Sequence, residues 1–178
     1  MSVCSTNVLH VEDDEFQRKL IAHHLGTMKN FDFTIHCVDS ESDAVSAFER
    51  TTFDLVILDY FLKEGNGGTC LVQLRHVNPF VPVIAISGGD TALISTELFR
   101  LGADAFINKR HFKGDSFTQS VRGALSRTDA GRQSESVRDG GVPPLTTPHA
   151  RLQPIMRAWS RGIESLPAFF SPCVGTLR

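Results

Sequence analysis

Residues 55–59 read LVILD and residues 81–87 read VPVIAIS, and these two stretches decide the fold. Both are almost continuously apolar until a polar residue ends them, as expected for parallel strands that helices cover on both faces. Shorter apolar runs mark the other strands. We expect strands at residues 8–11, 33–38, 55–58, 81–86 and 105–107.

Segments with helical spacing follow each of these strands. They cover residues 16–25, 42–50, 69–77, 92–101 and 116–125. In the second segment Ala44, Val45, Ala47 and Phe48 share one stripe, behind a capping serine that is either Ser40 or Ser42. Five β-then-α units of this length predict an α/β fold, with a doubly wound, five-stranded parallel sheet and right-handed crossovers.

Composition narrows the class of protein. Hydrophobic residues make up 41% and charged residues 21% of the chain, and the net charge is −2. This balance argues against a general attraction to nucleic acid or to acidic membranes. The four cysteines are scattered, so we expect reduced thiols. We see no secretory signal and no apolar run near the roughly 20 residues of a membrane span, and we expect a cytoplasmic protein.

The pattern changes after Arg127. Residues 128–149 are rich in Gly, Ser, Thr, Pro and charges and lack periodicity, which predicts a flexible linker. Residues 150–178 form a short tail, expected to be disordered or weakly helical, in which one amphipathic helix fits at 154–166. The α/β domain is therefore assigned to residues 1–127.

Chemically reactive side chains stand where the predicted strands end. Glu12 and Asp13 follow the first strand, Asp59 ends the third, Ser87 the fourth, and Lys109 follows the fifth. The fold brings the carboxyl ends of parallel strands to one edge. Clustered carboxylates repel one another, so a divalent cation or a lysine must offset them, and oxygen ligands suit Mg²⁺. With a metal beside it, Asp59 could act as the nucleophile toward a phosphoryl group.

Neighbouring residues have plainer interpretations. Asp14 and Glu15 are expected to stabilise a helix N-terminus. His10, within the first strand, is expected to be a core histidine with its hydrogen bonds satisfied. Phe106 is either a core aromatic or part of a switch, and the two roles do not exclude each other.

Taken together, these positions resemble the receiver domain of bacterial two-component response regulators, over about residues 7–127. The acidic pair falls on Glu12 and Asp13, the phosphoacceptor on Asp59 in FDLVILDY, and the switch hydroxyl on Ser87 in PVIAISG. The lysine falls on Lys109 in LGADAFINK. Gly67 matches the family's loop glycine, and Arg18 its basic residue after the acidic pair.

The resemblance implies a flavodoxin-like fold and a Mg²⁺ site. Its ligands would be Asp13, Asp59 and the main-chain carbonyl of Phe61, with Glu12 acting through water. The phosphodonor would be a sensor histidine kinase or a histidine phosphotransfer protein. Phosphorylation would draw Ser87 toward the phosphoryl group and turn Phe106 inward.

The resemblance also implies how such a switch acts. The face made by the fourth helix, fifth strand and fifth helix would change its contacts with an unidentified downstream protein. The chain would catalyse only its own phosphorylation and dephosphorylation, and so would not be an enzyme in the usual sense. We expect no DNA-binding output domain in these residues, no nucleic-acid partner and no membrane partner.

Some residues depart from the family pattern, and other functions compete. Arg110 follows Lys109 where the family usually has proline, and Lys63 also replaces a common proline. This favours one alternative, a degenerate receiver that binds proteins without being phosphorylated. A phosphatase with an aspartyl-phosphate intermediate would need a second acid where Phe61 stands. A flavin or nucleotide binder would need a glycine-rich loop after the first strand, which the sequence lacks.

Overall fold

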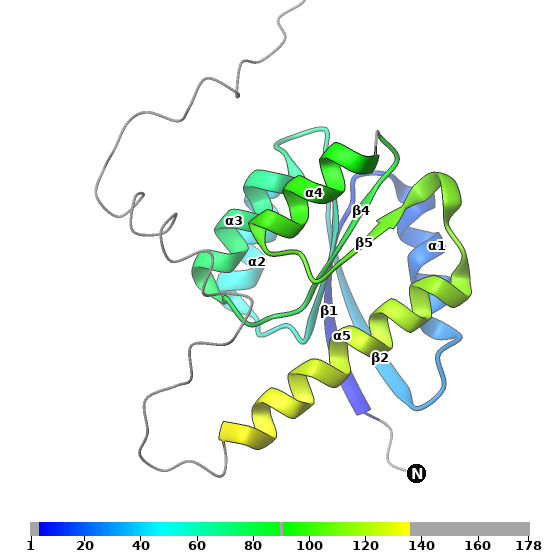
Figure 1. The fold of residues 1–178 in the computed structure, drawn as a ribbon, viewed down its shortest axis with the longest axis vertical. Coiled ribbons are helices and arrows are strands. Elements are labelled where there is room, and N and C mark those ends of the chain that lie inside the picture. Colours follow the sequence, from blue (N-terminus) through cyan, green and yellow to red (C-terminus); the bar gives the residue numbers. More distant parts are fainter. Residues whose placement is uncertain (1–3, 90, 136–178) are drawn as a thin grey trace, which may run out of the picture.

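A computed structural model describes residues 4–89 and 91–135 of the chain (Figure 1). Parallel strands alternate with helices, which confirms the predicted α/β fold. The strands are β1 (Cys4–Val11), β2 (Phe31–Val38), β3 (Leu55–Asp59), β4 (Val83–Ser87) and β5 (Ala105–Asn108). The helices are α1 (Glu15–Gly26), α2 (Glu41–Arg50), α3 (Gly67–Val77), α4 (Thr91–Leu101), the 3₁₀ turn η1 (Lys109–His111) and α5 (Gly114–Glu135).

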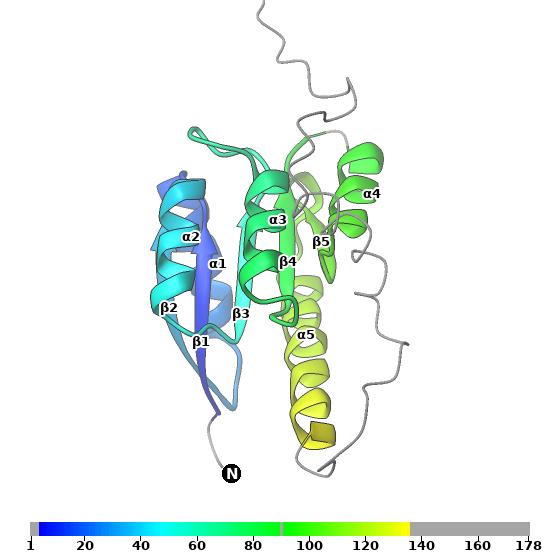
Figure 2. The same cartoon turned by 90° about the vertical axis from the view of Figure 1, so that its left-hand side faces the viewer.

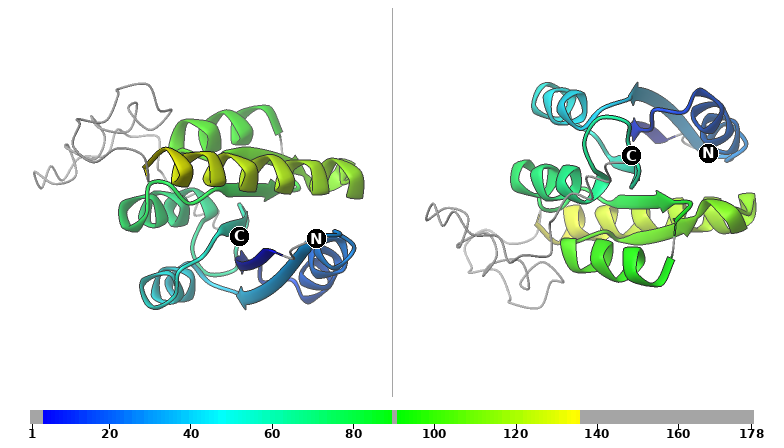
Figure 3. Two further views of the ribbon diagram at one scale, coloured as in Figure 1. Left: turned by 90° about the horizontal axis from the view of Figure 1, so that it is seen from below. Right: turned by 90° about the horizontal axis from the view of Figure 1, so that it is seen from above.

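The sheet has the strand order β2-β1-β3-β4-β5, and every pair of neighbours is parallel. Helices α1 and α5 cover one face, and α2, α3 and α4 cover the other (Figures 1 and 2). Views from below and above show the sheet between these two layers (Figure 3). The strand order reverses between β1 and β3, and loops at the carboxyl ends of strands near such a reversal are the usual binding sites of this architecture.

Each face of the sheet has its own hydrophobic core. Along β1, Leu9 and Val11 pack on the side of α2, α3 and α4, whereas Val8 packs on the side of α1 and α5. All residues of β3 and β4 are buried. Burial on both faces leaves no position for a solvated polar side chain, and this explains the continuous apolar runs in the sequence.

Side-chain caps fix the starts of three helices. Asp14 accepts a hydrogen bond from Gln17 N at the start of α1, as predicted for a capping residue. Ser40 is the cap of α2 and accepts from Asp43 N, which settles the choice between Ser40 and Ser42. Asn66 caps α3 by accepting from Gly68 N. Each cap satisfies a backbone N–H that the helix itself leaves free.

Several elements are longer than their sequence patterns predicted. β1 begins at Cys4 and β2 at Phe31, because their first residues pair with each other ahead of the point where β3 begins. α5 continues to Glu135, past the predicted end at 125 and into the range predicted as linker. The rest of that linker and the tail at 150–178 lie outside the described residues. No helix in the described ranges is both long and apolar enough to span a membrane.

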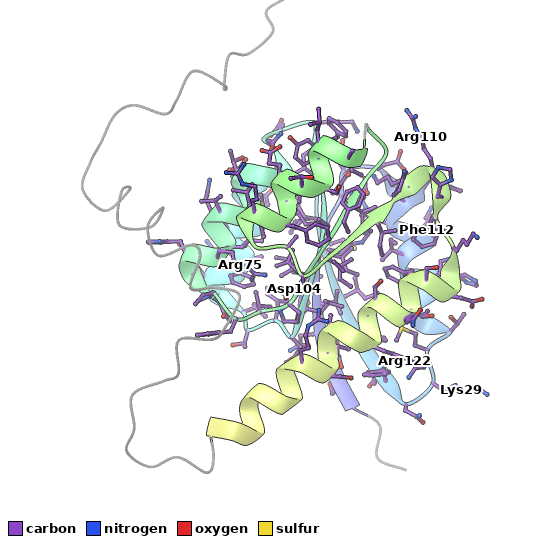
Figure 4. All side chains as sticks on the ribbon, viewed as in Figure 1. Lys29, Arg75, Asp104, Arg110, Phe112 and Arg122 are labelled. Carbon is purple, nitrogen blue, oxygen red and sulfur yellow. The ribbon has the colours of Figure 1, made fainter. Side chains whose placement is uncertain are left out.

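A buried arginine ties three segments together at the edge of the sheet opposite the strands' carboxyl ends. Arg75 of α3 is only 3% exposed and lies next to Asp104 (Figure 4). Its guanidinium donates to Gly102 O at 2.7 Å, to Asp104 Oδ2 at 3.0 Å and to Val81 O at 2.5 Å. Asp104 Oδ2 also accepts from Val83 N at 2.9 Å. The network therefore joins α3, the start of β4 and the α4–β5 turn.

Candidate functional site

Three carboxylates meet at the carboxyl ends of β1 and β3. Glu12 and Asp13 stand in the loop after β1, and Asp59 is the last residue of β3. One oxygen from each lies within 4.8 Å of the others. Glu12 and Asp59 are buried, at 1% and 4% exposure, whereas Asp13 is partly open. Three acidic side chains this close need a positive charge among them.

Lys109 supplies that charge from the end of β5. Its Nζ lies 2.7 Å from Glu12 Oε2 and 2.8 Å from Asp59 Oδ2. Burial alone would lower the pKa of Lys109, but its hydrogen bonds to Asp59 and Glu12 outweigh burial and raise the pKa. Burial raises the pKa of Glu12, helped by the charge of Asp59 and opposed by Lys109. The lysine therefore stays protonated between the two carboxylates.

The loop around Lys109 reaches the site without proline. The described peptide bonds are all trans, including the bond between Lys109 and Arg110. Asn108 caps the short η1 turn by accepting from Arg110 N at 2.8 Å. Arg110 itself is exposed and points away from the fold (Figure 4). Lys109 therefore reaches Glu12 and Asp59 although Arg110 follows it in place of the family's usual proline.

Backbone contacts hold the acidic loops in place. Arg18 of α1 donates to the Glu12 carbonyl at 2.8 Å, which gives this predicted basic position a structural role. Gly67 N donates to the Tyr60 carbonyl at 2.9 Å. A Cβ at Gly67 would overlap the Asp59 carbonyl oxygen, so only glycine lets α3 start this close to the end of β3.

Asp59 and Asp13 have the features expected of metal ligands. Asp59 Oδ1 is buried and has no hydrogen-bond partner among the described residues. A buried carboxylate oxygen without a partner is costly unless a ligand satisfies it. Within the described residues, the side chain of Asp13 has only a loose ion pair, 3.4 Å from the exposed ammonium of Lys63. The donor set is oxygen only, which suits a hard divalent ion such as Mg²⁺.

The remaining predicted residues surround this cluster. Ser87 is fully buried at the end of β4, and its Oγ accepts from Gly89 N at 3.2 Å within its own loop. Among the described residues outside its chain neighbours, a Cβ at Gly88 would meet only Lys109 Cβ, at an ordinary contact distance of 3.8 Å. Phe106 is partly buried against the core on the α4 side. Phe61 is 53% exposed beside the loop after β4.

His10 departs from its predicted role. It is buried in β1, as predicted, but its Nδ1 has no hydrogen-bond partner within the described part of the chain. Burial, and then the positive charges of Lys109 and Arg18, lower the pKa of His10 to about 4 from 6.5. The ring therefore stays neutral in the folded protein at pH values where an unfolded chain would protonate it.

This shift predicts an acid-sensitive stability. Above pH 6.5 His10 is neutral in both the folded and the unfolded protein, so it does not affect stability. Between pH 6.5 and 4 only the unfolded protein takes up a proton at His10. Over that range the free energy of unfolding should fall by about 3 kcal/mol through this residue. Denaturant titrations in EDTA, with His10→Leu, should lack this part of the pH dependence. The exposed His111→Gln should keep it, and parallel curves for wild type and His10→Leu would contradict the prediction.

Comparison with known proteins places this geometry in a family. A family model described as the response regulator receiver domain matches residues 8–122. The chain is 30% identical over 141 residues to the sensory transduction protein RegX3 of Mycolicibacterium smegmatis, covering 77% of this chain and 60% of RegX3. It is 32% identical over 117 residues to the uncharacterized transcriptional regulatory protein YcbL of Bacillus subtilis, covering 66% of this chain and 50% of YcbL. The chain thus spans about half the length of these curated relatives.

Solved structures of receiver domains have a similar fold. The receiver domain of NtrX from Brucella abortus superposes with a TM-score of 0.61 at 27% identity, covering 67% of this chain and 98% of that one. The receiver domain of the sensor histidine kinase PA1611 from Pseudomonas aeruginosa, solved with a magnesium ion in its active site cleft, has a TM-score of 0.61. At 19% identity, over 69% of this chain and 99% of that one, it supports the fold alone. Because the family match covers more than half of the chain, this protein belongs to the response regulator receiver domain family of two-component systems.

Proposed function

We propose that this chain is a phosphorylation switch that accepts a phosphoryl group on Asp59. The observation that carries the proposal is how the two oxygens of the Asp59 carboxylate are bound. The residue belongs to the carboxylate cluster with Glu12 and Asp13. Lys109 holds one oxygen at 2.8 Å, while Oδ1 is buried without a partner among the described residues. Such an oxygen is oriented and available as a nucleophile.

The transfer would use the residues as follows. An Asp59 oxygen attacks the phosphorus of a phosphohistidine on a sensor histidine kinase or a histidine phosphotransfer protein. The new P–O bond forms as the P–N bond breaks, and the imidazole, already protonated on its other ring nitrogen in the phosphohistidine, leaves as neutral imidazole. Lys109 stays protonated and neutralises charge on the phosphoryl oxygens, and the Ser87 hydroxyl donates to one of them once it turns from Gly89. Positioning and charge neutralisation provide the rate enhancement in this class of reaction.

Mg²⁺ fits the acidic cluster as the cofactor. Asp13, Asp59 and the main-chain carbonyl of Phe61 would hold it, with Glu12 acting through water. When bound, the ion supplies positive charge that offsets the carboxylates and the phosphoryl oxygens. The receiver domain of PA1611, which shares this fold, was solved with a magnesium ion in its active site cleft, and we propose the same ion here by analogy.

Metal binding gives the first functional test. Asp13→Asn should weaken Mg²⁺ binding at least tenfold, because it removes a charged oxygen ligand from the site. Isothermal titration calorimetry would measure the affinity. Asp14→Asn is the matched control, since asparagine caps a helix as well as aspartate and the exposed Asp14 lies outside the cluster. Equal affinities for Asp13→Asn and Asp14→Asn would rule out Asp13 as a ligand.

Phosphorylation would act through contacts with other proteins. Movement of Ser87 and inward rotation of Phe106 would alter the face made by α4, β5 and α5, shifting the population between two states. We assign the receiver unit to residues 1–127, in line with the family match over 8–122. The chain would process no external substrate. Its action without nucleic acid, in the cytoplasm, stays a prediction, since the curated relatives include transcriptional regulators and are longer than this chain.

Phe61 is proposed to set how long the phosphoryl group persists. Its ring is bulky, apolar and two residues after Asp59, where it would shield the acyl phosphate from water. We therefore expect Phe61→Asn to speed dephosphorylation several-fold, measured as loss of the phosphorylated mass after removal of the phosphodonor. The exposed Phe80→Asn, before β4 and away from the site, should match the wild type. An unchanged lifetime in Phe61→Asn would refute the shielding role.

A further inference from the structure

Two consecutive aromatic residues connect the phosphoacceptor strand to α4. Tyr60 follows Asp59 directly, and its hydroxyl donates to Glu97 Oε2 of α4 at 3.1 Å. The ring of Phe61 lies against Gly89, where a Cβ would come within 2.6 Å of the ring and 2.9 Å of Ile94 Cδ1. The loop after β3 therefore meets both the start and the middle of α4.

These contacts fall on one face of α4. Ile94 and Glu97 are three residues apart, so their side chains neighbour each other on the helix. The carboxylate of Glu97 also reaches the start of α3, where a Cβ at Gly68 would lie 3.6 Å from Glu97 Oε1. Burial, and then the charge of Glu97, raise the pKa of Tyr60, so the phenol stays protonated and can donate.

The two ends of α4 are held differently. Just past the C-terminal end, Arg75 binds the Gly102 carbonyl and Asp104. Before the N-terminal end, the chain runs from Ser87 through two glycines, and the Ser87 hydroxyl accepts from Gly89 N. A hydroxyl that turns toward Asp59 must give up that bond and release the segment that leads into α4. Any movement of α4 that follows would pivot about the end that Arg75 fixes.

We propose that the Tyr60–Glu97 hydrogen bond is a latch that holds α4 in its unphosphorylated position, and that phosphorylation of Asp59 opens it. The inference rests on the proposed function. A bond made only in the unphosphorylated arrangement favours that arrangement, and by linkage it opposes phosphorylation. Removing the bond raises the fraction of molecules in the competent arrangement, and the phosphorylation rate rises by the same factor while that fraction is small.

The test uses the full chain and three substitutions. Tyr60→Phe keeps the ring and removes the hydroxyl, which also meets the Asn66 side chain. Glu97→Met removes the acceptor and keeps a helix-forming side chain of similar length. Arg100→Gln, exposed on α4, is the control. Intact mass gives the initial rate of phosphorylation by acetyl phosphate with saturating Mg²⁺. Both latch variants should react roughly 10- to 150-fold faster than wild type, the range that the net free energy of one hydrogen bond to a charged group corresponds to.

Two further readouts separate a latch from a structural contact. The Tyr60→Phe/Glu97→Met double variant should react no faster than the faster single variant, because both remove the same bond. Amide hydrogen exchange in α4 should be faster in each latch variant without phosphodonor, and in wild type after phosphorylation.

The outcomes divide cleanly between the two proposals. If wild type is phosphorylated and the latch variants react at the rate of Arg100→Gln, the latch is overturned and the proposed function stands. If wild type takes up no phosphoryl group, the proposed function fails and the coupling fails with it.

Discussion

Asp59→Asn is expected to lose phosphoryl acceptance completely. Asparagine has nearly the same shape as aspartate, so the substitution leaves the packing of β3 in place while replacing the nucleophilic carboxylate by an unreactive amide. Lys109 keeps its 2.7 Å contact with Glu12. Incubation with acetyl phosphate and Mg²⁺, followed by a phosphate-affinity gel, should show a retarded band for wild type and none for the variant.

A control variant and a folding measurement show whether the loss of phosphorylation is specific to Asp59. Asp14→Asn removes a nearby exposed carboxylate and preserves the cap of α1, so it should be phosphorylated as wild type is. Circular dichroism should show that Asp59→Asn is folded. A retarded band of normal intensity in folded Asp59→Asn would mean that another residue accepts the phosphoryl group.

Arg75→Met is expected to lower the free energy of unfolding by roughly 3–5 kcal/mol, the usual cost of removing one partner from a buried ion pair. The substitution leaves Asp104 without its cation, and it removes the donors from the carbonyls of Val81 and Gly102. Denaturant unfolding followed by circular dichroism would measure the change. Because Arg75 lies outside the carboxylate cluster, Mg²⁺ affinity in the folded variant should match wild type.

A double-mutant cycle assigns this cost to the pair. Asp104→Asn removes the charge and keeps an oxygen that can accept from Val83 N. The Arg75→Met/Asp104→Asn variant should lose clearly less stability than the two single losses added together, because the uncompensated charge is gone. Arg100→Met on the exposed face of α4 should change stability by about 0.5 kcal/mol or less. A similarly small loss for Arg75→Met would contradict the stabilising role of the Arg75 hydrogen bonds.

The carboxylate cluster could be predicted because chemistry and topology coincide in the chain. β3 and β4 are readable as strands since burial on both faces demands continuous apolar residues. Once the strands are known, their carboxyl ends must share an edge, and Glu12, Asp59 and Lys109 follow without further information. The contact of Lys109 Nζ with both acids is the consequence.

Long-range polar contacts could not be predicted in the same way. Arg75 follows Leu71 and Leu74 on the buried stripe of α3, so a charged residue on an apolar face was a visible signal. Its partner Asp104 is 29 residues away, and Glu97 is 37 residues from Tyr60. Periodicity carries no information about such pairs. The extension of α5 was missed for a related reason, since residues 128–135 are mostly polar and show no apolar stripe.

For a buried polar residue such as His10, the sequence predicts burial but not the hydrogen-bond partners. Its place in an apolar strand predicted burial, and the structure has it buried. Whether a ring nitrogen finds a partner depends on neighbours from other elements, and here Nδ1 has none among the described residues. Sequence alone therefore gave the environment of this residue but not its hydrogen bonds.

The most direct test of Mg²⁺-dependent phosphorylation at Asp59 is to locate the phosphoryl group by mass spectrometry. Wild type treated with acetyl phosphate and Mg²⁺ should gain one phosphoryl group in its intact mass, and EDTA should prevent the gain. Borohydride reduction of the acyl phosphate and peptide mapping should then place the modification on Asp59. Modification at a different residue, or no gain in mass by a folded chain with Mg²⁺ present, would contradict the assignment of Asp59 as the phosphoacceptor.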